Sequence, residues 1–133
     1  GAFMSRTYSP AQTAYLLALA TEEAVKAEAR EVTIAFDAYC DRETEGMSED
    51  EATAWLRAQC ENAQPNPVLV RYSEASRALA AAEVALVEWS IAVALRAART
   101  RSEREAAEVC RDRGMRSYSA RPKLVALAMQ LNA

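Results

Sequence analysis

The hydrophobic pattern is most regular between Val68 and Arg113, a stretch that contains no Gly or Pro and lies between Pro67 and Gly114. Apolar residues recur there at alternating spacings of three and four, the period of a helix that packs along one side. The pattern predicts one long helix, about 70 Å in length if it is unbroken.

The predicted long helix carries two apolar seams on nearly opposite sides. The first seam consists of Tyr72, Ala75, Leu79, Ala82, Leu86, Trp89 and Val93. The second seam consists of Val84, Val87, Ile91, Leu95, Ala98, Ser102, Ala106 and Val109. Because both seams are present from Val84 to Val93, we expect this part of the helix to be buried from two sides.

Capping signals mark the other predicted helices. Ser9-Pro10-Ala11-Gln12 is a helix start, because Ser caps helices, Pro fits the first position and Gln closes a capping box. The helix that follows, over about 10–42, has the packing stripe Tyr15, Ala18, Val25, Ala29, Val32, Phe36 and Tyr39. Ser48 begins a helix over about 49–62, and a last helix is predicted over about 121–131.

These elements predict an all-α fold: a four-helix, bundle-like single domain over residues 1–133, centred on the helix 68–113. The helix 10–42 matches the length of the central helix that carries the first seam, so we expect the two to pack together. The second seam would be covered by the helix 49–62, by the helix 121–131 or by a second chain. Gly1 to Phe3, which precede Met4, resemble an expression-vector remnant and are left out of the fold.

The long helix also predicts a dimer. Its cover along the first seam should stop near Arg96, where that face becomes cationic, and the rest of the helix would then overhang. An overhanging helix with a seam of small residues is a common means of associating two chains. We therefore expect a homodimer with the candidate seam Ile91, Leu95, Ala98, Ser102, Ala106 and Val109.

Charge is distributed unevenly, although the net charge is only −3. Residues 1–95 have a net charge of −8, and residues 96–133 a net charge of +5. The candidate partner or polyanion surface of the basic end consists of Arg96, Arg99, Arg104, Arg111, Arg121 and Lys123. An acidic protein surface, such as that of a second copy, and nucleic acid are both open as partners. Solvent alone is the third alternative, because i,i+4 pairs such as Arg99–Glu103 are typical of a solvated helix.

Residues that commonly carry catalysis are scarce. The chain has no His, which excludes Ser–His and Cys–His pairs and removes the most common metal ligand. Its three Gly provide no phosphate-binding loop. Cys40, Cys60 and Cys110 fit small thiols in a reducing cytosol better than a disulfide framework or a redox site. We expect no enzyme activity, no catalytic residues, no cofactor and no metal site.

Two acidic features have simple structural interpretations. The cluster 49–51 fits a capped helix start better than a cation site. Glu88 fits the edge of a buried face better than a buried functional carboxylate. No uninterrupted apolar run approaches the roughly 20 residues of a membrane span, and no signal-peptide pattern is present. We therefore expect a cytoplasmic location without membrane contact.

Together these observations favour a non-enzymatic helical protein–protein interaction module, either an assembly subunit or a regulator, that acts through a surface of the helix 68–113. The alternative is a small nucleic-acid-binding protein. It would use the Arg-rich face of the C-terminal part of that helix and the start of the helix 121–131.

Overall fold

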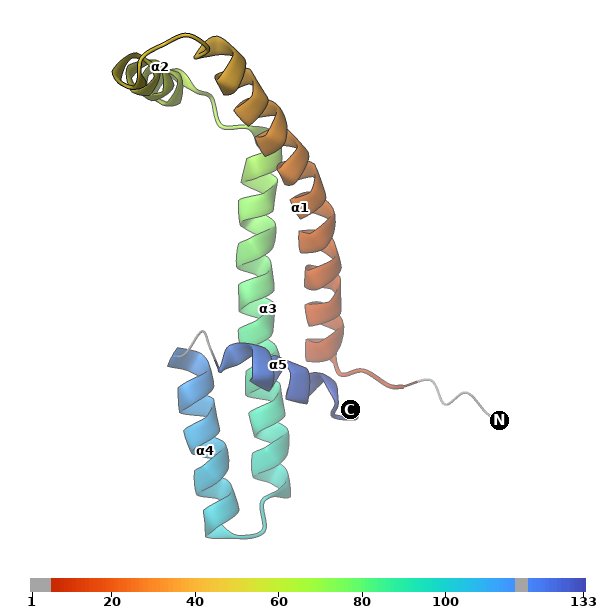
Figure 1. The fold of residues 1–133 in the computed structure, drawn as a ribbon. Helices are drawn as coiled ribbons and strands as arrows, with labels where there is room; N and C mark the ends of the chain where they lie inside the picture. Colours follow the sequence, from red (N-terminus) through yellow and green to blue (C-terminus); the bar gives the residue numbers. More distant parts are fainter. Residues whose placement is uncertain (1–5, 117–119) are drawn as a thin grey trace. The chain divides into compact units, whose positions relative to one another are not determined.

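A computed structural model describes residues 6–116 and 120–133 and shows an all-α fold of bundle-like character. Five helices occupy these residues, in the order α1 (Pro10–Glu43), α2 (Glu49–Asn62), α3 (Pro67–Ala97), α4 (Arg101–Arg116) and α5 (Arg121–Met129) (Figure 1). The predicted fold class is confirmed, with a long central helix that packs against the first one.

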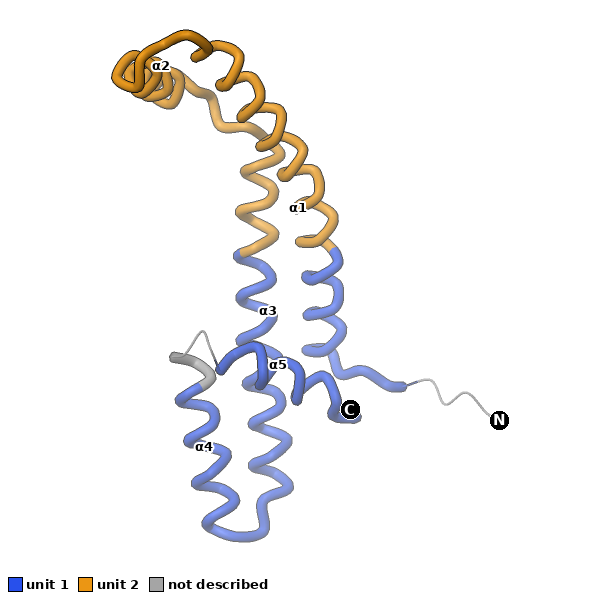
Figure 2. Tube along the Cα trace, viewed as in Figure 1, with its two compact units in different colours: residues 1–20, 77–133 blue, residues 21–76 orange. Residues whose placement is uncertain are grey.

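The chain forms two compact units (Figure 2). Unit 1 contains residues 1–20 and 77–133, and unit 2 contains residues 21–76. Both α1 and α3 run through the two units, so each unit holds a segment of each helix. The single domain over residues 1–133 stays a prediction.

The predicted helix starts are confirmed by their hydrogen bonds. In α1 the Gln12 N–H donates to the Ser9 hydroxyl (3.1 Å), and the Ser9 N–H donates to the Gln12 side-chain oxygen (2.8 Å). This is the reciprocal capping box that the sequence predicts. In α2 the Ser48 hydroxyl accepts from the Glu51 N–H (3.2 Å), and acidic residues occupy the first turn. The capped helix start was therefore the correct interpretation of residues 49–51.

The core of unit 1 lies where the two seams of α3 overlap. Leu86, Val87 and Ile91 are buried there against Val125 and Ala128 of α5. Ala11 and Tyr15 from the start of α1 pack against the same cluster. The predicted burial of this part of the helix is confirmed, with α5 and the start of α1 both packed against it. The helix predicted over 121–131 ends at Met129, where the Gln130 N–H bonds to carbonyls of the last turn.

The predicted long helix is not continuous over 68–113, and the four predicted helices become five. The chain leaves the helix after Ala97, and α4 begins at Arg101. Thr100 caps the new helix, because its hydroxyl accepts from the Glu103 N–H (3.1 Å). The Glu103 carboxylate in turn accepts from the N–H groups of Arg99 (2.7 Å) and Thr100 (3.3 Å). Thr100-x-x-Glu103 is thus a capping box that starts a new helix.

The new helix α4 folds back beside the second half of α3 (Figure 1). Residues of both helices and of α5 line one hollow, which includes Ile91, Ala107 and Leu124. The helix also continues past Gly114, where the sequence predicted its end, and reaches Arg116. The sequence also predicts a linker over 115–120, which falls partly on residues 117–119, outside the described part of the chain.

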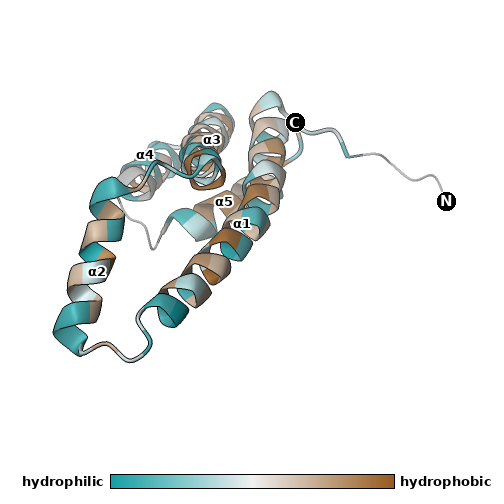
Figure 3. Ribbon diagram, turned by 90° about the horizontal axis from the view of Figure 1, so that it is seen from above, coloured by the Kyte–Doolittle hydropathy of each residue, from teal (hydrophilic) through white to brown (hydrophobic). Residues whose placement is uncertain are grey.

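Unit 2 is built from the later part of α1, all of α2 and the first turns of α3. Ala29 and Ala75 are buried in it, as is Cys40. An ion pair joins Glu28 of α1 to Arg71 of α3 at 2.9 Å. No residue of α2 is fully buried. Figure 3 shows hydrophobic and hydrophilic residues interspersed along α1 and α2.

Within residues 6–116 and 120–133, α3 is the one helix that is long and apolar enough to cross a membrane by length and composition. The sequence pattern predicted no such segment, because Glu83 and Glu88 interrupt its apolar run. They interrupt it without making the helix polar on average. One helix of this kind does not by itself indicate a membrane protein, and carboxylates in a membrane span are costly.

Candidate functional site

The arginines predicted to share one face are divided between two helices. Arg96 lies on the last turn of α3, whereas Arg104 and Arg111 lie on α4. Because the chain turns back between them, Arg111 is about 15 Å along α4 from its start and is no longer in line with Arg96. A single row of guanidinium groups, as an unbroken helix would present, does not form.

The individual basic residues nevertheless stay accessible. Arg96, Arg99, Arg104, Arg111 and Lys123 are exposed, and Arg121 is half-buried. In the predicted i,i+4 pair Arg99–Glu103, the Glu103 carboxylate accepts a hydrogen bond from the backbone N–H of Arg99. The neighbouring pair Arg101–Glu105 forms at 3.0 Å on an exposed face. Unit 1 has a net charge of +5, so it keeps its cationic character.

The candidate dimer seam is also divided. Ile91 is buried and Leu95 is half-buried against the chain's own core, so both are covered within unit 1. Ala98 lies in the break between α3 and α4. Ser102, Ala106 and Val109 remain exposed on α4 at the spacings of one helix face. What remains of the predicted seam is therefore a short stripe on α4.

A larger apolar surface lies in unit 2. A groove of about 930 Å3 runs between the second half of α1, the segment after α2 and the start of α3. Its lining residues are mostly apolar and comprise Val32, Thr33, Ala35, Phe36, Tyr39, Ala63, Gln64, Pro65, Asn66 and Leu69. The side chains of Phe36, Tyr39 and Leu69 are 47%, 39% and 42% exposed, so the groove is open to solvent.

The sequence explains both walls of the groove. Val32, Phe36 and Tyr39 continue the packing stripe of α1 at spacings of four and three. The opposite wall is set by Pro65-Asn66-Pro67, which starts α3 through a hydrogen bond from the Val68 N–H to the Asn66 side-chain oxygen (2.9 Å). Leu69 follows in the first turn and faces the groove. The stripe on α1 is thus longer than the segment of α3 that covers it.

An aromatic row supports the wall formed by α1. The rings of Phe36 and Tyr39 have centroids 6.5 Å apart, and the ring of Tyr39 lies 5.8 Å from Trp55 of α2. Ring pairs at these separations attract each other in tilted arrangements. Tyr39 therefore lies between the groove and α2 and contacts an aromatic ring on each side.

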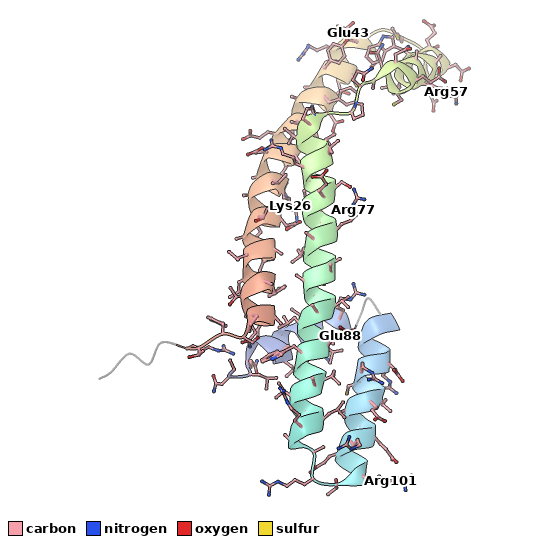
Figure 4. The ribbon with its side chains drawn as sticks, turned by 180° about the vertical axis from the view of Figure 1, so that it is seen from behind. Lys26, Glu43, Arg57, Arg77, Glu88 and Arg101 are labelled. Atoms are coloured by element: carbon pink, nitrogen blue, oxygen red, sulfur yellow. The ribbon has the colours of Figure 1, made fainter. Side chains whose placement is uncertain are left out.

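The unit that contains the groove has a strongly negative net charge. Unit 2 has five basic and 13 acidic side chains, a net charge of −8. Seven acidic side chains and one basic side chain fall within residues 37–51, which include the turn between α1 and α2. Glu43 lies at the end of α1 beside this turn (Figure 4). Since 32, 36, 39 and 43 share one helix face, Glu43 follows directly on the lining residues of α1.

The three cysteines are free thiols. Cys60 and Cys110 are exposed, whereas Cys40 is buried. Burial raises the pKa of the Cys40 thiol, and the negative charges of Asp37 and Asp41 raise it further. A raised pKa favours the unreactive neutral thiol at neutral pH. In the described part of the chain, no three His, Cys, Asp or Glu side chains lie close enough together to hold a metal ion.

The periodicity of the first helix predicts a different role for the groove residues. It places Val32, Phe36 and Tyr39 in the packing stripe of the first helix, where they would be buried. These residues do lie on the stripe, but Phe36 and Tyr39 in its last two turns are exposed. The available signal was the short segment 63–66. This segment is too small to cover the large side chains opposite it. The helix α3 begins directly after it, at Pro67.

No protein-family model, curated protein or solved structure matches this chain.

Proposed function

We propose that this chain is a non-enzymatic protein–protein interaction module, an assembly subunit or regulator that binds another protein through the groove of unit 2. The observation that supports this most directly is the exposure of large apolar side chains from two helices in one continuous groove. Contiguous apolar surface of this kind is uncommon on a protein that acts alone and is typical of binding sites. The start of α3 forms one wall of the groove through Leu69, so the proposed binding surface includes part of α3.

Differential capture from an extract of the source cell tests this function. The native chain is compared with Leu69→Asp, which places a charge in the groove, and with Ile34→Asp. Ile34 is 63% exposed on the same helix as Phe36 and is not part of the groove. A protein retained by the native chain and by Ile34→Asp but lost with Leu69→Asp supports the proposal. Identical captured proteins for all three chains contradict it.

The proposal includes a homodimer and a cytoplasmic location. The exposed stripe Ser102, Ala106 and Val109 on α4 offers small side chains for close helix packing between two chains. The three free thiols are consistent with a reducing compartment. Glu83 and Glu88 support an aqueous setting for α3, because carboxylates in a lipid core are costly.

Nucleic-acid binding by unit 1 is the second candidate, and the net charge of +5 with exposed Arg96 and Arg104 favours it. Arg–phosphate contacts release counterions, so binding should weaken steeply with salt. A gel shift at about 50 mM salt with duplex and single strands tests it. A shift that the combined change of Arg96, Arg104 and Arg111 to Glu removes supports this candidate. The absence of any shift contradicts it.

A further inference from the structure

We infer that the groove of unit 2 binds a basic amphipathic helix of another protein, with the basic end of that helix at the turn between α1 and α2. This inference rests on the proposed function and specifies the chemistry of the partner. It follows from the shape of the groove, from the charge around it and from the residues at its two ends.

The shape favours a helix over a small molecule. Ligand pockets enclose most of the surface of their ligand, whereas Phe36, Tyr39 and Leu69 leave this groove open along its length. The lining residues of α1, from Val32 to Tyr39, extend about 10 Å along the helix axis. Two to three turns of a partner helix would cover that length with apolar side chains at i, i+3, i+4 and i+7.

The charge selects the sign of the partner. A second unit 2 packed against this groove would bring two net charges of −8 together, so the like charges oppose a dimer formed groove to groove. A cationic partner is attracted instead. The stripe on α4 of a second copy offers only Ser102, Ala106 and Val109. These side chains are too small to occupy a groove of about 930 Å3.

The two ends of the groove differ, which gives the partner helix a direction. Beyond Tyr39 lie Glu43 and the rest of the acidic segment 37–51. At the other end, a smaller hollow adjoins the groove through Thr33 and Leu69 and is also lined by Lys26 and Arg30. Complementary charges therefore place Lys or Arg of the partner near Glu43 and leave its uncharged or acidic end near Lys26.

Two labelled model peptides test the inference with the full chain. Both are about five turns long with the same Leu face, and the polar positions are Lys in one peptide and Glu in the other. Fluorescence anisotropy measures the affinity of each. We expect the Lys peptide to bind at least about ten-fold more tightly than the Glu peptide at low salt, with the difference shrinking as salt rises.

Variants identify the groove as the binding site. Phe36→Asp should weaken binding of the Lys peptide about ten-fold or more, and Ile34→Asp should leave it unchanged within about two-fold. Leu69→Asp on the opposite wall repeats the test should Phe36→Asp lose helicity by circular dichroism. Glu43→Lys with Glu45→Lys should reduce the preference for the Lys peptide, because both carboxylates lie where we place the basic end of the partner helix.

Several outcomes would overturn the inference: equal affinity for the two peptides, equal loss with Phe36→Asp and Ile34→Asp, or no binding of the Lys peptide. Conversion of a dimer into a monomer by Phe36→Asp would show that a second copy fills the groove, and would also overturn it. A partner captured through Leu69 while the Lys peptide fails to bind leaves the proposed function in place and rejects only the basic helix.

Discussion

The side-chain amide of Gln12 donates a hydrogen bond to the backbone oxygen of Ala128, with 2.9 Å between Nε2 and the oxygen. Both residues are buried, at 0% and 1% exposure. The same amide also donates to the Leu131 carbonyl (2.8 Å), and Arg6 donates to the carbonyls of Met129 and Leu131. The start of α1 and the end of α5 are thereby joined within unit 1 by polar contacts far apart in sequence.

Replacement of Gln12 should destabilise unit 1. Gln12→Ala removes two hydrogen bonds to carbonyls and the side-chain half of the capping box, so we expect a loss of about 2 kcal/mol in the free energy of unfolding. Chemical denaturation measures the loss, and hydrogen exchange should show faster exchange in α5. Gln130→Ala is the control, because Gln130 lies at the end of α5 and is exposed. Equal stability of the two variants would contradict the role assigned to Gln12.

The break between α3 and α4 predicts that Thr100→Ala lowers the stability of the protein, the opposite of the effect expected inside a helix. In an unbroken helix Thr100→Ala would stabilise the protein, since Ala has the higher helix propensity. At an N-cap the same change should instead destabilise it by about 1 kcal/mol. Thermal unfolding decides between the two, with Ser102→Ala inside α4 as a control of neutral or slightly stabilising effect. A stabilised Thr100→Ala variant would contradict the break and favour a continuous helix.

The homodimer predicted from the small-residue seam has a direct test at Ala106. Light scattering of the native chain at micromolar concentration should give the mass of a dimer. Ala106→Arg should give the mass of a monomer with unchanged helicity, because a long charged side chain prevents close packing of α4 against a second chain. A monomeric native chain would contradict the predicted homodimer.

The cysteines should differ in their reaction with alkylating reagents. Cys40 is buried and its pKa is raised, so it should react much more slowly than the exposed Cys60 and Cys110 at pH 7 to 8. Peptide mass spectrometry after timed alkylation measures the three rates. Because the folded state favours the neutral Cys40 thiol, its contribution to stability should fall as pH rises above the ordinary cysteine pKa of about 8.5. Equal rates for all three thiols would contradict the assigned burial.

Periodicity was sufficient to predict the helices that depend on an apolar stripe and a clear cap. The bounds of α1 and α2 and the burial of Leu86 and Ile91 follow from such local signals. The break at Thr100 was missed because the apolar period of the second seam continues across it, and periodicity alone does not register a change of chain direction. Thr100-x-x-Glu103 was nevertheless visible as a capping box.

The candidate site was harder to predict, because its formation depends on what fails to cover a stripe. Phe36 and Tyr39 have the spacing of core residues, and their exposure depends on the point at which Pro67 starts α3 opposite them. The arginine face had the converse problem. Arg96 and Arg111 share a face only if the helix between them is continuous, so a single capping residue separates them.

Site-specific photocrosslinking in the source cell tests whether the groove of unit 2 is a docking surface. A photoreactive phenylalanine analogue replaces Phe36 in one chain and Ile34 in another. Exposure alone would favour adducts at position 34, which is 63% exposed against 47% for position 36. The account predicts a discrete protein adduct at position 36 and none at position 34. The same adducts at both positions, or adducts at position 34 alone, would contradict it.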